Sequence, residues 1–381
     1  MDSILPEFGN IDIILIIFSI IPLLILNLTT LFNIIFGPYL RKEFPLSNSP
    51  KVSVLIPARN EVNNIKNCIK SILEQDYSDF ELIVLDDNSD DGTYELLCEL
   101  QFQHPKLTVV KGKELPDDWL GKNWACHQLS QYANGDIFIF TDADNKHSPI
   151  AITRTVAYIQ RYGLDFASAF PQQITNSFSE KLIVPMIDLI IYSGLPLWAT
   201  RFVPHKAFAA ANGQWIAMIK DAYLKSGGHS AVRQEIAEDV ALSKLFKSLR
   251  FKILTMIGTD VVYCRMYTNL HEIRQGLSKN LFALAGFNTA VFIILLMLGL
   301  SSTVMPFVFL LFGIHGNSLF LSIMLNLMLR FLQALAFRHN VMVSVILHPV
   351  SIIGTFFIAL ESLYRTKKGK NVWKERKIQR S

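Results

Sequence analysis

Long apolar stretches occupy both ends of the chain, and a segment of mixed polarity lies between them. Nearly every residue from Ile11 to Phe36 is apolar, which exceeds the roughly 20 residues that a helix needs to cross a bilayer. Apolar segments return near 281–300, 304–314, 319–337 and 341–363. The second of these is too short to span alone. We therefore predict an N-terminal membrane anchor at 1–40, a water-soluble domain at 41–280, a C-terminal transmembrane region at 281–364 and a basic tail at 365–381.

The soluble part alternates between short apolar runs and amphipathic segments. The run "KVSVLIPARNE" predicts a strand over residues 51–56 that Pro57 ends, and apolar residues at helical spacing follow up to Leu73. The stretch "FELIVLDDNSDDGT" repeats this plan with a helix from about Thr93, and "LTVV" predicts a third strand that ends at Val110. Alternation of this kind predicts an α/β, Rossmann-like fold with a mainly parallel sheet. No Gly-rich dinucleotide fingerprint follows the first strand, so we expect no nicotinamide cofactor.

A further apolar stretch, "LIVPMIDLIIYSGLPLW" at residues 182–198, lies inside the predicted soluble domain. If it crossed the membrane, it would separate two acidic motifs, at 142–144 and 238–239, that we expect to share a site. We therefore interpret it as an interfacial or core helix. A tail on the same side of the membrane as the domain requires an even number of crossings after the domain, and the sequence does not fix that number.

The distribution of charge predicts how the chain is oriented in the membrane. Asp2 and Glu7 precede the first apolar run and Asp12 lies at its start, whereas Arg41 and Lys42 follow it. The positive-inside rule therefore places the domain in the cytoplasm of a multi-pass cell-membrane protein. The net charge is only +4, and many cations lie in the tail "RTKKGKNVWKERKIQR". Such a run is typical of a segment facing anionic lipid, and no nucleic-acid motif accompanies it. The four cysteines lack metal-ligand spacing and are expected to be reduced.

Two carboxylates end the apolar run in "FIFTDADN". Asp142 and Asp144 follow a predicted buried strand, and ligands of parallel sheets bind outside the carboxyl ends of strands. The pair can be a simple turn, because Asp and Asn are common turn residues. Alternatively, the two side chains offer hard oxygen ligands suited to Mg²⁺ or Mn²⁺ that also bridges phosphates.

Three further motifs carry charged residues at the start of a predicted turn or helix. Asp86 and Asp87 end a strand and either hydrogen-bond a base or ribose or form a solvated turn. Lys122, in "WLGKNWAC", either neutralises a phosphate or is an ordinary exposed lysine. Glu238 and Asp239 begin an amphipathic helix, where the helix dipole alone favours carboxylates. The functional alternative for this pair is a general base.

Taken in order, these motifs resemble the family 2 glycosyltransferases. The series "PARNE", "LDDNSDDGT", "WLGKNWAC", "TDAD", "GGH" and "AEDVALS" covers most of the soluble domain. With "RMYTNLHEIRQGLSKNL" and a C-terminal membrane region, the chain looks most similar to the membrane-bound branch, which includes carotenoid-acid (diaponeurosporenoate) and hopanoid-associated enzymes. The resemblance implies the GT-A form of the fold, an inverting reaction and a nucleotide-sugar donor.

The resemblance also implies roles for particular positions. Pro57, Arg59 and Glu61 are expected to line the nucleotide pocket, and Asp87 to contact the base.

The resemblance further implies that Asp144 is the ligand of a divalent metal, that Asp142 is a ribose or metal-shell residue, and that Asp239 is the catalytic base. Arg274 and Lys279 are expected to meet the diphosphate or lipid headgroups. The tryptophan motif that holds the growing chain in processive polysaccharide synthases is absent from "RQGLSKN".

These inferences predict an enzyme that moves one sugar from a nucleotide diphosphate sugar, expected to be a UDP-hexose, to a lipid acceptor such as a carotenoid acid or another isoprenoid or glycolipid precursor. The alternatives are a polyprenyl-phosphate glycosyltransferase, a polysaccharide synthase, or a membrane scaffold that lacks activity.

Overall fold

The computed structural model describes residues 11–368, 372–373 and 376–377. Asp2, Glu7 and the remaining positions of the basic tail lie outside the described residues. The chain divides into two compact units. We call Gly37–Ile174 with Leu197–Met266 the sheet unit, and Met1–Phe36, Thr175–Pro196 and Tyr267–Ser381 the helical unit. Residues 175–196, inside the predicted soluble domain, thus belong to the helical unit.

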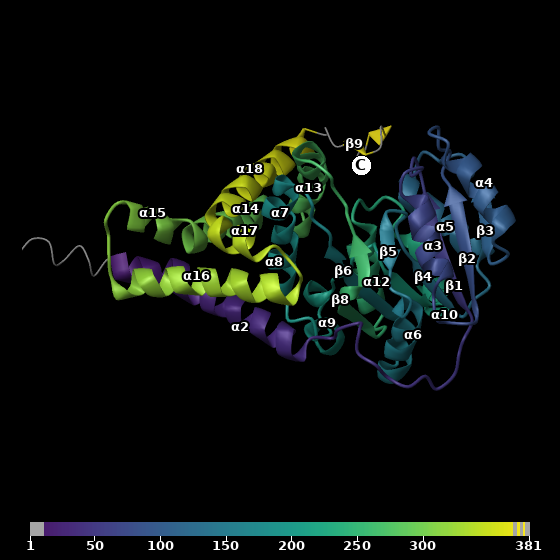
Figure 1. Ribbon diagram of the computed structural model, residues 1–381, viewed down its shortest axis with the longest axis horizontal. Helices are drawn as coiled ribbons and strands as arrows, with labels where there is room; N and C mark the ends of the chain where they lie inside the picture. The colour runs from purple at the N-terminus through teal and green to yellow at the C-terminus, as the bar shows by residue number, and fades with distance from the viewer. Residues whose placement is uncertain (1–10, 369–371, 374–375, 378–381) are drawn as a thin grey trace, which may run out of the picture. The chain divides into compact units, whose positions relative to one another are not determined.

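The sheet unit is built on one mixed sheet of eight strands (Figure 1), in the order β3-β2-β1-β4-β7-β6-β8-β5. Strands β3, β2, β1 and β4 run parallel, β7 is antiparallel to both of its neighbours, and β8 runs parallel to β6. The predicted α/β class and mainly parallel sheet are confirmed. The strands are β1 (Val52–Ala58), β2 (Phe80–Asp86), β3 (Leu107–Lys111), β4 (Ile137–Phe140), β5 (Asn145–His147), β6 (Phe166–Gln173), β7 (Ile216–Ile219) and β8 (Ile253–Cys264).

Strand β1 continues through Pro57, contrary to the predicted end at that residue. On the β4 side the pairing of β1 ends at Leu55, whose carbonyl accepts the backbone N–H of Thr141. The nitrogen of Pro57 faces this same side, because backbone groups alternate along a strand. Its missing N–H therefore removes no ladder hydrogen bond, which is where a strand tolerates proline.

Helices cover both faces of this sheet. Val54 and Ile56 of β1 pack in one core with α3 and α6, whereas Leu55 points to the opposite core with Leu129 of α5 and Phe246 of α12. Alternating burial of this kind is expected for a strand that is covered on both sides. The helices of the sheet unit are α3 (Ile65–Leu73), α4 (Thr93–Gln103), α5 (Gly121–Tyr132), α6 (Ala151–Tyr162), α9 (Ala199–Phe202), α10 (Lys220–Ser226), α11 (Gly228–Ala231) and α12 (Glu238–Ser248), with the 3₁₀ turn η2 (Lys206–Phe208).

The helical unit holds three helices, among the described residues, that are long and apolar enough to cross a membrane: Ile11–Phe36, Thr289–Leu311 and Asn317–Ala336. The stretch at 182–198 instead forms short helices, and the segment at 341–363 breaks at Leu347 before Pro349. The elements are η1 (Ile16–Ile20), α2 (Ile21–Phe36), α7 (Phe178–Ile183), α8 (Pro185–Gly194), α13 (Leu270–Leu284), α14 (Thr289–Thr303), α15 (Met305–Leu311), α16 (Asn317–Ala336), α17 (Val341–Ile346), α18 (His348–Lys367), β9 (Val372–Trp373) and β10 (Arg376–Lys377).

Buried polar side chains connect α2 to the other helices of this unit. Asn27 donates to the carbonyl of Leu325 on α16, Thr30 shares a 2.7 Å hydrogen bond with Ser193 on α8, and Asn33 donates to the carbonyl of Tyr192. Polar groups of this kind hold apolar helices together where hydrophobic burial gives no preference between lipid and protein. The first apolar segment is thus a packed member of a helical bundle.

Candidate active site

Polar residues follow β1, β2 and β4 at one edge of the sheet. The backbone N–H of Asp87, just after β2, donates to the carbonyl of Ala58 at the end of β1. Arg59 Nη1 donates to the carbonyl oxygens of Asp87 (2.6 Å) and Asn88 (3.0 Å). The loops that follow β1 and β2 are therefore tied together. The N–H of Glu61 completes the connection by donating to Thr93 Oγ1 at the start of α4.

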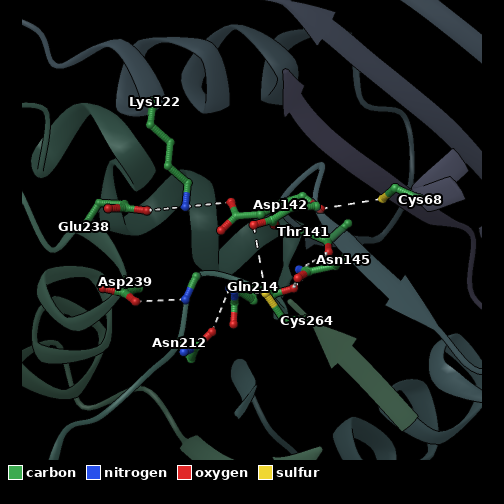
Figure 2. A network of polar contacts seen from close by, with 12 residues as sticks. Cys68, Lys122, Thr141, Asp142, Asn145, Asn212, Gln214, Glu238, Asp239 and Cys264 are labelled. Carbon is green, nitrogen blue, oxygen red and sulfur yellow. Dashed lines mark hydrogen bonds and ion pairs between the residues drawn. The ribbon is translucent and has the colours of Figure 1, made fainter. Parts of the chain in front are cut away.

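The loop after β4 is held in place by hydrogen bonds to the backbone of Gln214. Thr141 Oγ1 and Asn145 Nδ2 both donate to the carbonyl of Gln214, at 2.8 Å and 2.7 Å (Figure 2). These bonds hold both ends of the segment that contains Asp142 and Asp144. The two carboxylates therefore lie on a loop that is held at both ends.

Lys122, in the first turn of α5, lies between two carboxylates. Figure 2 shows its ammonium group between the side chains of Asp142 and Glu238. Nζ is 2.7 Å from Asp142 Oδ1 and 2.8 Å from Glu238 Oε1. Burial opposes its positive charge, but the two carboxylates more than offset this and hold the pKa of Lys122 well above its usual value. The lysine is therefore a fixed cation that connects β4 to the start of α12.

Asp239 is oriented by backbone groups. Oδ2 accepts the N–H of Gly213 at 2.8 Å, and Oδ1 accepts the N–H of Val240 at 2.7 Å. Burial and the adjacent Glu238 raise the pKa of Asp239 to about 6, although Lys122 opposes the shift. A carboxylate has about four acceptor positions, so it can still receive a proton or hydrogen bond from a ligand. Its raised pKa suits proton transfer near neutral pH.

Gly213 has little free space around its Cα. A Cβ at this position would lie 3.0 Å from Lys122 Nζ, 3.3 Å from Glu238 Oε1 and 3.6 Å from Asp239 Oδ2. We expect Gly213→Ala to lower kcat/KM by roughly tenfold or more by displacing the lysine, because sub-ångström shifts in a preorganised site are costly. Steady-state kinetics with a melting curve would test this. An unchanged kcat/KM would mean that the position of Lys122 is unimportant.

Asp144 lies next to this cluster with an unsatisfied oxygen. Its Oδ1 is buried and has no hydrogen-bond partner among the described residues, and its Oδ2 is 3.9 Å from the thiol of Cys264. Burial, Asp142 and Glu61 raise the pKa of Asp144 to about 7. A nearby cation would satisfy the oxygen and offset the repulsion. The donor set thus fits a hard divalent ion, with water or phosphate supplying further ligands.

No group of three or more His, Cys, Asp or Glu within the described ranges is arranged to hold a metal ion by itself. A small cavity nevertheless opens at the cluster, lined by Pro57, Lys122, Asp142, Gly213, His229 and Glu238, among others. The cavity brings together residues from the β1 end, the β4 loop, α5 and the start of α12.

Arg274 and Lys279 lie on α13, in the helical unit. Arg274 pairs there with Glu361 of α18. Both cations thus belong to the helical unit, whereas the cluster belongs to the sheet unit.

Several contacts and residues that shape the site were not predicted from the sequence. Glu238 was considered with Asp239 as a helix start or a general base, and its ion pair with Lys122, which joins positions far apart in the chain, was not predicted. Gly213 and Gln214 lie in "ANGQW", which contains no recognisable chemical motif. His229 was visible only as part of "GGH".

Comparisons with known proteins agree with this fold. Residues 53–192 match the model described as glycosyl transferase family 2. The 4,4'-diaponeurosporenoate glycosyltransferase of Staphylococcus haemolyticus (strain JCSC1435) is 31% identical over 235 residues, which are 60% of this chain and 60% of that protein. The enzyme of the same name from Staphylococcus aureus (strain USA300) is 26% identical over 244 residues, 63% of each chain. Each match thus spans less than two thirds of the relative's length.

Among solved structures, the mannosyltransferase PcManGT from Pyrobaculum calidifontis, in complex with GDP-Man and Mn²⁺, has the same fold. Its TM-score is 0.56 at 18% identity, and the superposition covers 96% of this chain and 99% of that one. The predicted family and fold are confirmed. Residues 53–192 match glycosyl transferase family 2, and the sheet unit, which holds most of this stretch, has the GT-A fold.

Proposed function

We propose that this protein is a membrane-bound, inverting glycosyltransferase that moves a single sugar from a nucleotide diphosphate sugar, a UDP-hexose, to a lipid acceptor. The observation that carries the proposal is the cluster of Asp142, Asp144, Lys122, Glu238 and Asp239 at the strand ends of a family 2 domain. The names of the relatives support a carotenoid acid, or a related isoprenoid or glycolipid precursor, as acceptor.

The donor would bind over the ends of β1 and β2. Pro57, Arg59 and Glu61 would line the nucleotide pocket, with Asp87 contacting the base. The bonds from Arg59 to the carbonyl groups of the β2 loop support this assignment, because they hold the two loops as one surface. Lys122 would face the diphosphate as a fixed positive charge.

Asp144, with Asp142, would hold a divalent ion, Mg²⁺ or Mn²⁺. Such an ion, when bound, stabilises the negative charge that develops on the departing diphosphate. The buried Oδ1 of Asp144, which has no hydrogen-bond partner in the described part of the chain, supports this role. The fold neighbour from Pyrobaculum calidifontis was itself solved with Mn²⁺.

Asp239 would act on the acceptor. A carboxylate held by the N–H groups of Gly213 and Val240 can accept the proton of an attacking hydroxyl, or orient an acceptor carboxylate. The oxygen of the acceptor forms its bond to the anomeric carbon as the bond to the diphosphate breaks, and the proton goes to Asp239. One displacement of this kind inverts the anomeric centre.

The dependence of kcat/KM on pH should reflect the ionisation of Asp239. Its pKa is raised from 3.8 to about 6, and the base must be ionised to accept a proton. We therefore expect kcat/KM to be constant above this pH and to fall about tenfold per pH unit below it. The rates should be measured at saturating Mn²⁺, with circular dichroism to verify the fold. A profile that stays flat down to pH 4.5 would exclude a raised pKa for the essential carboxylate.

Membrane attachment would bring the domain to an apolar acceptor. Three helices in the described part of the chain are suitable for spanning, and two of them follow the sheet unit. This even number supports a basic tail on the same side as the domain. We propose the cytoplasmic side, where the tail would meet anionic lipid. Arg274 and Lys279 would contact lipid headgroups.

The test uses detergent-solubilised full-length protein, a panel of radiolabelled UDP- and GDP-sugars, host lipid extract, and Mg²⁺ or Mn²⁺ with and without chelator. Chelator-sensitive label in the organic phase is the expected result. Label that stays in the aqueous phase would contradict a lipid acceptor. One sugar per acid-stable lipid would distinguish the proposal from a polysaccharide synthase, and an acid-labile sugar phosphate would indicate a polyprenyl-phosphate enzyme.

A further inference from the structure

The "GGH" motif, Gly227-Gly228-His229, has a physical explanation in the structure. Gly227 and Gly228 have φ values of +80° and +52°, in the left-handed region that favours glycine. A Cβ on Gly228 would lie only 2.3 Å from Cζ of Tyr223. The missing side chain therefore lets the Tyr223 ring pack directly against the backbone beside His229.

The Tyr223 hydroxyl contacts both the backbone and the imidazole of His229. The backbone N–H of His229 donates to the Tyr223 hydroxyl at 3.3 Å, and this hydroxyl lies 3.0 Å from His229 Nδ1. Burial raises the pKa of Tyr223, so the phenol keeps its proton and can donate it to Nδ1. An imidazole that accepts at Nδ1 carries its own proton on Nε2.

The imidazole remains neutral and lines the cavity of the candidate site. His229 is only 2% exposed, and burial lowers its pKa to about 3. Its ring meets that of Phe140, the last residue of β4, edge to face at 4.7 Å. Lys122 and Glu238 line the same cavity. The Tyr223 bond occupies Nδ1 and leaves Nε2 for a ligand.

We propose that His229 donates its Nε2–H to a hydroxyl oxygen of the sugar that is transferred, and that it helps to select that sugar. This inference rests on the proposed glycosyltransferase function. A neutral N–H donor suits an uncharged hydroxyl, whereas the fixed cation Lys122 in the same cavity suits the diphosphate. A buried donor that loses its partner is costly, so such a site rejects a sugar without the matching hydroxyl.

Two substitutions separate this role from a structural one. His229→Phe keeps a planar ring but removes the N–H, and His229→Gln retains an amide N–H near the position of Nε2. Each variant is compared with wild type in transfer assays and in titrations with UDP, UDP-glucose, UDP-galactose and UDP-N-acetylglucosamine, with GDP and GDP-mannose in parallel. Melting curves verify that the variants fold.

For the sugar nucleotide that wild type prefers, His229→Phe should lose about 10- to 100-fold in kcat/KM and in affinity, while binding of the parent nucleoside diphosphate stays within about twofold. His229→Gln should recover most of the loss. Equal loss for the nucleotide and the sugar nucleotide, or wild-type kinetics in His229→Phe, would overturn the inference. If wild type transfers no sugar, the proposed function fails, and the titrations still decide whether His229 contacts the sugar.

Discussion

Replacing Asp144 with asparagine is expected to abolish sugar transfer while the metal-free protein becomes slightly more stable. Asp144 is buried beside Asp142 and Glu61, and its pKa is raised from 3.8 to about 7. A carboxyl group with a raised pKa in the folded state favours folding most below pH 3.8, and this contribution is lost as the pH rises through 7. At pH 8 the ionised side chain therefore opposes folding, and a neutral amide removes that cost.

The rate of transfer should fall on the order of 10³-fold or more. An amide is a much weaker ligand for the cation, and the cation stabilises the charge of the transition state by several kcal/mol. The first readout is activity. The second is the melting temperature in chelator and in Mn²⁺, which is independent of turnover. Wild type should be stabilised by Mn²⁺, whereas Asp144→Asn should melt a few degrees higher than wild type in chelator and show little response to the ion.

A matched control is Asp260→Asn. This aspartate pairs with Arg41 at the surface of the same unit, and exposed pairs contribute little to stability. Transfer and the Mn²⁺ response of this control should match wild type. If Asp144→Asn retained the Mn²⁺ response and its turnover, the metal assignment would be wrong.

The alternation of strands and helices made the first half of the sheet predictable. Strands β1, β2 and β3 were each recognised from a short apolar run, with errors of one or two residues at their ends. The insertion of the antiparallel strand β7 between β4 and β6 was not predicted. Local pattern carries no information on the partner of a strand, because pairing is decided by packing between segments distant in the chain.

The same distinction applies to the site. Asp142 and Asp144 were identifiable because they directly follow an apolar run that predicts a strand. The bridge from Lys122 to Glu238 was not, since each residue taken alone resembles an ordinary helix start. Gly213 owes its importance to side chains that surround it, and no property of its own sequence context indicates them. The sequence therefore indicated the loops that form the candidate site, and it left the contacts between them undetermined.

Asp239→Asn tests the chemical step directly. The amide keeps the shape of the carboxylate and can still accept the N–H of Gly213 or Val240, so donor binding should remain within about twofold of wild type. Transfer should fall by about 10² to 10⁴, the usual contribution of a general base. Titration with the donor nucleotide and single-turnover assays at pH 8 measure the two effects separately.

Glu238→Gln is the informative companion to this variant. It removes the charge that holds Lys122 from the α12 side but leaves the proposed base in place, so donor affinity should change more than the rate of the bound complex. If Asp239→Asn lost donor binding but kept its turnover at saturating donor, Asp239 would act in donor binding, and Glu238 would become the candidate base. Retention of both by Asp239→Asn would mean that the acceptor arrives already ionised, as a carboxylate does at pH 8, and that no base is needed.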